Sequence, residues 1–352
     1  MNRYMWIIIL LNLWALSVLA QEADTFKFIN GKDLSISGQT AFVDSQSFHR
    51  ISPDYLEKLP ANVQEPATNS AGINVTFQMD SKSIRVQWQL NEYNELWNMT
   101  PLAVNGLDLY GWNGKEWQFV ASAAPWGIKN SVTFANNLDG RLRHYKIYLS
   151  LYTELKNIEI GVQETSVIKS ANSSRLPEKK VIIYGSSITQ GASAARPGMA
   201  YPSIVSRRLH IETINLGFSG TGKMEIGMAD IIGQLESGLI ILDCVPNPSP
   251  EQIKRRTVPF VNKIRLQKPD VPIVMMESIF REKDYWDMTL GEKLKFQNSN
   301  FRKVYQQLVE EEDTQLYYLS RKELYSSNHS LMVDGTHLTT EGHLQVSERG
   351  TN

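Results

Sequence analysis

Short segments of alternating hydrophobic and polar residues occupy the first half of the chain. In one of them Ile84, Val86 and Trp88 fall on one face of an extended backbone. Such alternation is typical of strands with one buried face. The strand-like segments are residues 73–79, 84–90, 107–112, 115–120, 144–151 and 155–162. Many short strands without a long helical pattern predict a β-sandwich or jelly roll over residues 21–168.

Two of these segments flank the dipeptide Asn113-Gly114. A type I′ hairpin turn needs positive φ at both of its central residues, and Asn-Gly is the pair that tolerates this best. We therefore expect a two-residue type I′ turn at this position.

The second half changes to hydrophobic strands that alternate with amphipathic helices. In the clearest helix, Phe301, Val304, Tyr305 and Leu308 follow the i, i+3, i+4, i+7 spacing. Strands are expected at 181–184, 213–216, 239–243, 273–277 and 316–319, and helices at 201–210, 223–235, 250–267 and 293–311. Strands separated by helices predict an α/β domain with a parallel sheet covered on both faces.

Between the halves, residues 169–179 are polar and lack periodicity, which is typical of a linker. The first twenty residues combine Arg3, an apolar middle and small residues before Gln21. This pattern indicates a secretory signal peptide cleaved after Ala20, with an uncleaved membrane anchor as the alternative. The expected organisation is a signal peptide (1–20), a β-sandwich (21–168), a linker (169–179) and an α/β domain (180–352), in a secreted or periplasmic protein.

Composition narrows the classes of function. The 352 residues are 42% hydrophobic and 21% charged, with a net charge of -1, which suits a globular protein of about two domains. A near-neutral charge gives no reason to expect nucleic acid as a partner. The single cysteine, Cys244, excludes an internal disulfide and is expected to be an inert core thiol. No cluster has metal-ligand spacing, so we expect neither metal nor cofactor. The sequence does not indicate the oligomeric state.

Five tryptophans of the first half leave two interpretations open. They are Trp88, Trp97, Trp112, Trp117 and Trp126. Flat rings could form a platform on which sugars stack. Cross-strand aromatic packing is the more common use of such residues, and we favour it for any single tryptophan.

Four polar motifs follow strands of the second half, and the carboxyl ends of parallel strands share one edge of a sheet. They are Gly185-Ser186-Ser187-Ile188-Thr189, Asn215-Leu216-Gly217-Phe218-Ser219-Gly220, Asp243-Cys244-Val245-Pro246-Asn247 and Asp334-Gly335-Thr336-His337. Serine is a weak nucleophile until a base takes its proton, and histidine can do so near neutral pH. A carboxylate can orient the ring, and backbone N–H groups or an amide can bind the oxyanion. These residue types predict acyl transfer, although the first two serines could also simply cap a helix.

The four motifs resemble the conserved blocks of the SGNH/GDSL hydrolases, and Gly106–Trp112, GLDLYGW, resembles the GxDLY-type domain that precedes some of them. This resemblance implies that Ser187 is the nucleophile, His337 the general base and acid, and Asp334 its orienting carboxylate. It also implies an oxyanion hole formed by the N–H groups of Ser187 and Gly220 and the side chain of Asn247. The implied fold of the second half is a three-layer, flavodoxin-like hydrolase domain.

The chain departs from the family pattern at three positions. Ser186 replaces the usual aspartate, Val245 a glycine and Pro248 an aspartate. The last two changes make the assignment of Asn247 less secure than that of the triad.

Other polar residues near the motifs are not expected to take part in the reaction themselves. His343, on an expected final helix, is expected to be structural. Arg196 is expected to be an ordinary surface residue, with a contact to an acidic substrate group as the alternative. Glu277 ends a strand at the active edge, where it could support the site.

The expected function is that of a secreted serine esterase acting on short acyl groups, acetyl first, with a carbohydrate as the substrate that the resemblance implies. A lipid or phospholipid acyl hydrolase and a non-catalytic carbohydrate-binding protein are the alternatives. No membrane span is expected after signal cleavage.

Overall fold

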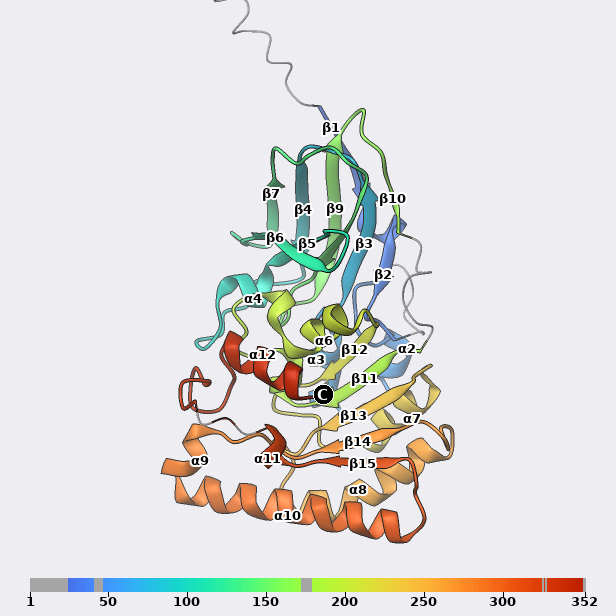
Figure 1. Ribbon diagram of the computed structural model, residues 1–352, viewed down its shortest axis with the longest axis vertical. Helices are drawn as coiled ribbons and strands as arrows, with labels where there is room; N and C mark the ends of the chain where they lie inside the picture. Colours follow the sequence, from blue (N-terminus) through green and yellow to red (C-terminus); the bar gives the residue numbers. More distant parts are fainter. Residues whose placement is uncertain (1–24, 41–46, 172–178, 325, 327, 351–352) are drawn as a thin grey trace, which may run out of the picture.

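The computed structural model of the chain describes residues 25–40, 47–171, 179–324, 326 and 328–350 (Figure 1). A β-rich part lies at one end of the long axis, and an α/β part lies at the other. The expected signal peptide lies outside the described residues, as do residues 172–178 of the expected linker. Within the described ranges, no helix has the length and apolar character needed to cross a membrane.

Two antiparallel sheets form the N-terminal domain, as the alternation predicts. The first has the order β1 (Phe26–Asn30), β9 (Leu155–Gln163), β4 (Ile84–Leu90) and β7 (Lys129–Ala135). The second has the order β10 (Ile168–Ser170), β3 (Asn74–Met79), β8 (Arg143–Tyr148), β5 (Leu107–Trp112) and β6 (Trp117–Ala123), with β2 (Ser35–Ser37) beside β3. Val86 of the first sheet and Ile147 of the second are buried in one shared core, so the sheets form a sandwich.

The hairpin between β5 and β6 corrects one expectation. The chain reverses over Gly114 and Lys115, where the N–H of Asn113 donates to the carbonyl of Glu116 at 3.1 Å. Gly114 has a φ of 106°, but Asn113 is not among the residues with positive φ, so the type I′ prediction is wrong. The Asn113 carboxamide oxygen accepts from the N–H groups of Lys115 and Glu116, both at 2.9 Å. Because this side chain caps the turn, Asn113 keeps an ordinary backbone conformation.

Three short helices that the alternation did not reveal interrupt the N-terminal domain: α2 (Pro53–Leu56), α3 (Ala61–Thr68) and α4 (Pro101–Asn105). Val63 and Ala67 of α3 are buried in the core of the α/β domain and not in that of the sandwich. A piece of the first half therefore completes the core of the second. At the other boundary, β10 continues to Ser170, inside the segment expected to be a linker.

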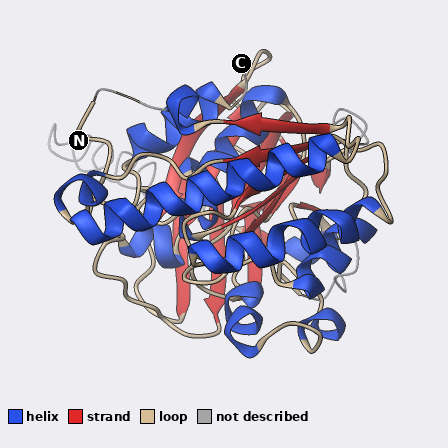
Figure 2. Cartoon of the chain, turned by 90° about the horizontal axis from the view of Figure 1, so that it is seen from below, coloured by secondary structure: helices blue, strands red, loops and turns tan. Residues whose placement is uncertain are grey.

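The second half contains a five-stranded parallel sheet that includes all five expected strands. Its order is β12 (Thr213–Gly217), β11 (Val181–Gly185), β13 (Leu239–Asp243), β14 (Ile273–Met276) and β15 (Leu316–Leu319). The helices are α5 (Ser187–Gln190), α6 (Tyr201–Leu209), α7 (Ile226–Gln234), α8 (Pro250–Arg265), α9 (Glu282–Trp286), α10 (Met288–Glu310), α11 (Arg321–Leu324) and α12 (Thr340–Arg349). Figure 2 shows helices lying across the strands when the molecule is viewed from below.

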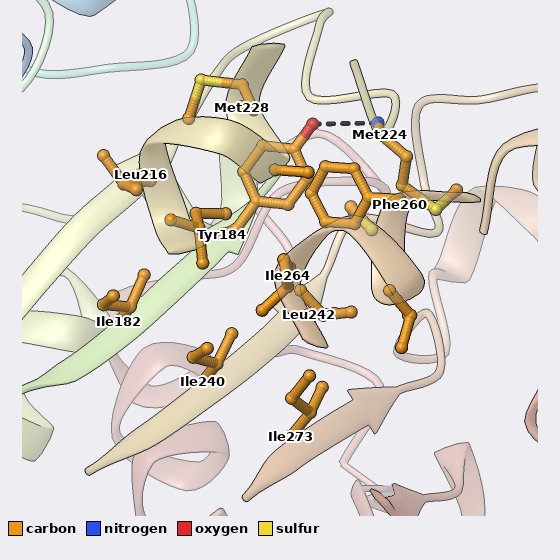
Figure 3. Packing of buried hydrophobic residues seen from close by; sticks show 14 of the residues in the cluster. Ile182, Tyr184, Leu216, Met224, Met228, Ile240, Leu242, Phe260, Ile264 and Ile273 are labelled. Atoms are coloured by element: carbon orange, nitrogen blue, oxygen red, sulfur yellow. Dashed lines mark hydrogen bonds between the residues drawn. The ribbon is translucent and has the colours of Figure 1, made fainter. Parts of the chain in front are cut away.

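Apolar side chains cover both faces of this sheet. One face packs against α7, α8 and α10 through Met228, Phe260 and Phe301. The other packs against α6, α11 and α12 through residues such as Tyr201 and Val346. Figure 3 shows the first face, where Tyr184 of β11 stacks on Phe260 and its hydroxyl accepts from the N–H of Met224 at 2.9 Å. A sheet buried on both faces explains why its strands read as continuous apolar runs.

Candidate active site

Ser187 lies where the central strand β11 turns into the short helix α5. Ser186 caps this helix, and its hydroxyl accepts from the N–H of Ile188 at 3.3 Å. A Cβ atom at Gly185 would lie 1.9 Å from the Thr189 hydroxyl oxygen, so only glycine allows the helix to pack this close to the strand. Ser187 is the first residue of α5, where an N–H has no partner inside the helix, and the residue is 8% exposed.

His337 and Asp334 reach Ser187 from the loop before α12. The hydroxyl of Ser187 lies 2.9 Å from Nε2 of His337. Nδ1 of the same ring lies 2.7 Å from Oδ2 of Asp334. A carboxylate can only accept here, so it holds the proton of the neutral ring on Nδ1 and leaves Nε2 free to accept from Ser187. The three expected triad residues, which are far apart in the sequence, thus form one hydrogen-bonded chain.

Four donors surround the Asp334 carboxylate. Oδ1 accepts from the N–H groups of Thr336 (2.9 Å) and His337 (2.7 Å), and Oδ2 accepts from the His337 ring and from the Asn98 amide (2.9 Å). Desolvation raises the pKa of Asp334, but these hydrogen bonds outweigh it and lower the pKa to about 2. Asp334 is therefore ionised at neutral pH, as a partner for a protonated ring must be.

Two residues expected in an oxyanion hole lie on neighbouring loops. Gly220 follows β12 with a φ of 67°, and a Cβ atom there would meet nothing within 4 Å, so the space on that side of the residue is open. The amide nitrogen of Asn247 donates to the carbonyls of Phe218 (3.2 Å) and Thr221. The Asn247 amide thus holds the loop that carries Gly220. This contact differs from the expected one, in which the amide binds the oxyanion.

Beneath α5 lies a buried carboxylate, the first residue of the third motif, for which the sequence predicted no role. Oδ2 of Asp243, at the end of β13, accepts from the hydroxyls of Thr189 (2.7 Å) and Tyr201 (2.8 Å). Burial raises the pKa of Asp243 to about 6, although both hydrogen bonds oppose the shift. Asp243 ties α5 and α6 to the central strands and so helps to hold Ser187 in place.

The N-terminal domain supplies further groups to this site. Asn98 contacts Asp334 as described above, and the Tyr152 hydroxyl donates to the carbonyl of Ser187 at 3.4 Å. Asn69 accepts from the Gln190 side chain of α5 at 3.0 Å. None of these residues belongs to the four catalytic motifs, and only the tertiary arrangement reveals their place at the site.

A cavity of about 330 Å³ adjoins His337, and most of its wall comes from the N-terminal domain. The lining contains two carboxylates and several amides but neither lysine nor arginine. Its residues are Glu65, Pro66, Asn69, Asn94, Glu95, Leu96, Asn98, Met99, Tyr152, Gln190, Ala192, Ser219 and His337. The wall of this cavity is therefore part polar and part apolar, and it offers no cationic partner to an anionic group.

The GLDLYGW motif joins the two domains beside the site. Asp108 is fully buried, and its Oδ2 accepts from Arg196 (2.8 Å) and from the N–H of Gly198 (2.9 Å). The Tyr110 hydroxyl lies 2.6 Å from the same guanidinium, which also lies over the Phe119 ring at 3.8 Å. The expectation that Arg196 is an ordinary surface residue is wrong, because it anchors the loop that follows α5 to the sandwich.

The remaining candidates have structural partners. His343 is buried on α12, where Nε2 donates to the carbonyl of Ala192 at 3.1 Å, and desolvation lowers its pKa to about 4. The Glu277 carboxylate accepts hydrogen bonds from the side chains of Arg302 and Tyr318 and from the N–H of Arg321, none of which is a triad residue. Cys244 is fully buried, and burial raises its pKa well above the usual range. Among the described residues, no group of three His, Cys, Asp or Glu could hold a metal ion.

The tryptophans divide between the two interpretations. The Trp88 indole is buried and donates to the carbonyl of Asn105 at 3.1 Å, and Trp112 pairs edge-on with Trp117. Trp97 and Trp126 are 86% and 85% exposed. In the sequence, Trp97 stands between Leu96 and Asn98, which both line the cavity.

Comparison with known proteins agrees with this architecture. A GDSL-like lipase/acylhydrolase family model matches residues 178–349, and the model of the N-terminal GxDLY domain of SGNH-type esterases matches residues 26–168. A crystal structure assigned as a GDSL-like lipase from Bacteroides ovatus ATCC 8483 is 34% identical, with a TM-score of 0.89 over 93% of this chain and 96% of the other. The chain belongs to the GDSL-like lipase/acylhydrolase family. It is accordingly an ester-hydrolysing enzyme with a GxDLY-type N-terminal domain.

More distant structures share the fold of this GDSL-like enzyme. A salicylyl acyltransferase from a tetracycline biosynthetic pathway is 18% identical, with a TM-score of 0.76 over 92% of this chain and 95% of the other. A family two carbohydrate esterase from Clostridium thermocellum, in complex with cellohexaose, is 13% identical, with a TM-score of 0.60 over 80% of this chain and 91% of the other. No curated protein sequence matches the chain significantly.

Proposed function

We propose that the chain is a serine esterase that removes short acyl groups, acetyl first, from a carbohydrate through Ser187, His337 and Asp334. The observation that carries this proposal is the continuous hydrogen-bonded chain from the Ser187 hydroxyl through the His337 ring to Asp334. We also propose that residues 1–20 direct export and are removed, which the mass of the mature protein would test.

In the proposed reaction, the Ser187 oxygen attacks the ester carbonyl carbon while Nε2 of His337 takes its proton. The tetrahedral oxyanion is stabilised by the N–H groups of Ser187 and Gly220, with Asn247 shaping the Gly220 loop. Collapse breaks the bond to the alcohol, which leaves with the proton from His337. Water then gives its proton to the same nitrogen and attacks the acyl-enzyme. Collapse of the second tetrahedral intermediate breaks the bond to the Ser187 oxygen, which takes the proton back from His337, and the acid is released.

Several features support a small acyl group on a hydroxyl-rich partner. The cavity beside His337 is small, and its amides suit hydroxyl groups better than an alkyl chain. The exposed Trp97 between cavity residues offers a face on which a sugar ring can stack. The related fold of a carbohydrate esterase solved with cellohexaose is compatible with such a substrate.

One observation favours a lipid ester as the second candidate. Helix α9 touches the triad loop, because the N–H of Lys283 donates to the carbonyl of Gly335 at 2.9 Å. Beside this contact Tyr285, Trp286 and Met288 are between 66% and 80% exposed. An exposed apolar surface near the reacting residues would suit an enzyme that works at a lipid interface.

Hydrolysis by the purified full chain separates the candidates. We expect activity on 4-nitrophenyl acetate and on acetylated polysaccharides, with little on decanoate esters. Ser187→Ala should lower kcat/KM at least about a thousandfold. The neighbouring cap variant Ser186→Ala should keep far more activity, and a fluorophosphonate should label Ser187 in peptide mass spectra. Acetate hydrolysis that survives Ser187→Ala would refute the nucleophile, and preference for decanoate would favour the lipid substrate.

A further inference from the structure

Asn98 lies outside the four motifs, yet its side chain contacts two residues of the proposed triad. Its amide nitrogen lies 2.9 Å from Oδ2 of Asp334 and 3.3 Å from Nδ1 of His337. Since Nδ1 also donates to that oxygen, the amide and the ring are two donors sharing one acceptor. Asn98 comes from the N-terminal domain, 236 residues before Asp334 in the chain.

Both domains hold Asn98 in this position. The Ser193 hydroxyl donates to the Asn98 carbonyl at 2.9 Å. Two residues later, the Thr100 hydroxyl donates to the carbonyl of Ala195 at 2.8 Å and also caps α4 by accepting from Ala103. The backbone around Asn98 is therefore tied to the loop that follows α5, and the amide has little freedom to turn away from Asp334.

We propose that Asn98 is a positioning residue of the hydrolytic centre, which orients the Asp334 carboxylate and tunes its charge toward the His337 ring. The inference rests on the proposed function, because it assigns a role to that same triad. By donating to Oδ2, Asn98 draws off part of the negative charge that would otherwise act on the ring. It also completes the set of four donors that keeps the carboxylate in one orientation.

The electrostatic surroundings of His337 allow this effect to be isolated. The other titratable groups around the ring come from the triad loop, the final helix and the cavity wall: Asp334, His343, Glu65, Glu95 and Tyr152. Asn98 contacts both Asp334 and His337 directly. The cavity carboxylates Glu65 and Glu95 belong to exposed residues, so solvent screens the effect of their charge on the His337 ring.

The test is the pH dependence of kcat/KM for 4-nitrophenyl acetate in three variants of the full chain. Asn98→Ala should lower kcat about tenfold, because poorer alignment of the His337 ring slows the chemical step. KM should change little although Asn98 also lines the cavity, because 4-nitrophenyl acetate carries no hydroxyl group for the Asn98 amide to bind. Asn98→Asp adds negative charge beside the ring, favours its protonated form and should move the acid limb of the profile up by about one pH unit. Asn91→Asp adds the same charge at an exposed residue outside the cavity wall and should leave that limb in place.

A second readout does not depend on turnover. With 15N-histidine in the chain and the His337→Gln variant for assignment, NMR follows the titration of the His337 ring, and Asn98→Asp should raise its midpoint. If hydrolysis requires Ser187 and yet both Asn98 variants keep the wild-type acid limb and ring titration, the role of Asn98 is refuted while the esterase proposal stands. If Ser187→Ala remains active, the esterase proposal itself fails. If Asn91→Asp shifts the limb as far as Asn98→Asp does, the effect is only one of net charge and the positioning role is refuted.

Discussion

At the scale of single residues, burial perturbs two groups beneath the site in opposite directions. Asp243 has a raised pKa of about 6, and His343 has a lowered pKa of about 4, with desolvation the largest cause of each. An acid whose pKa is raised by folding stabilises the protein below its unfolded pKa and loses that contribution as the pH rises through 6. A histidine whose pKa is lowered stabilises above 6.5 and loses its contribution as the pH falls to 4.

These two contributions oppose each other over the same pH range, and matched variants should separate them. Each shift corresponds to about 3 kcal/mol. In Asp243→Asn, which keeps an oxygen for the Thr189 and Tyr201 hydroxyls, the free energy of unfolding should fall as the pH drops from 6.5 to 4. In His343→Gln, which keeps a donor for Ala192, it should rise over that range. Urea unfolding at several pH values measures both slopes, and slopes equal to that of the wild type would contradict this account.

At the scale of elements, the contact between α5 and the strands beside it places Ser187. Thr189 and Gln190 of α5 pass so close to β12 that a Cβ atom at Gly217 would lie 2.1 Å from the Gln190 nitrogen and 2.6 Å from the Thr189 carbonyl carbon. These are backbone atoms, which cannot rotate away as a side chain can. The helix can keep its place only if residue 217 is glycine.

Gly217→Ala should therefore destabilise the fold by about 1–3 kcal/mol or more, and it should lower kcat because α5 must shift. The matched control is Gly127→Ala, where a Cβ atom meets nothing within 4 Å and φ is not positive. Calorimetry should show a lower Tm for the first variant and almost no change for the second. Equal Tm values would mean that β12 and α5 separate without cost.

At the scale of the whole molecule, the two domains build one site. Asp108 holds Arg196 and Gly198 of the loop that follows α5, and the same loop holds Asn98 through Ser193. The motif residues of the N-terminal domain thus have a mechanical role, which is to fix the position of one domain against the other.

Asp108→Asn should cost about 3–5 kcal/mol, because it leaves the largely buried Arg196 without its counter-charge. It should also lower kcat/KM, since the loop that anchors Asn98 loosens. The control is Asp230→Asn, which breaks a more exposed pair with Lys263 at 2.9 Å and should cost less than about 1 kcal/mol. Denaturant unfolding and hydrolysis measured on both variants provide the check. A loss of unfolding free energy no larger than that of Asp230→Asn would refute the role of Asp108 in holding the two domains together.

The sequence by itself determined the two kinds of domain, the five parallel strands and the chemical types in the four motifs. It could do so because period-two and period-3.6 patterns, and polar residues directly after strands, are local properties of a chain. It did not place α3 in the core of the other domain, detect the partners of Arg196, or identify Asn98 and Tyr152 at the site. Those contacts depend on which surfaces of the two domains pack together. A hydrogen bond between residues 236 positions apart in the sequence, such as that of Asn98 with Asp334, produces no periodic pattern in the chain. The tertiary structure alone decided that the wall beside His337 belongs mostly to the N-terminal domain, because that wall forms only when the sandwich packs against the edge of the parallel sheet.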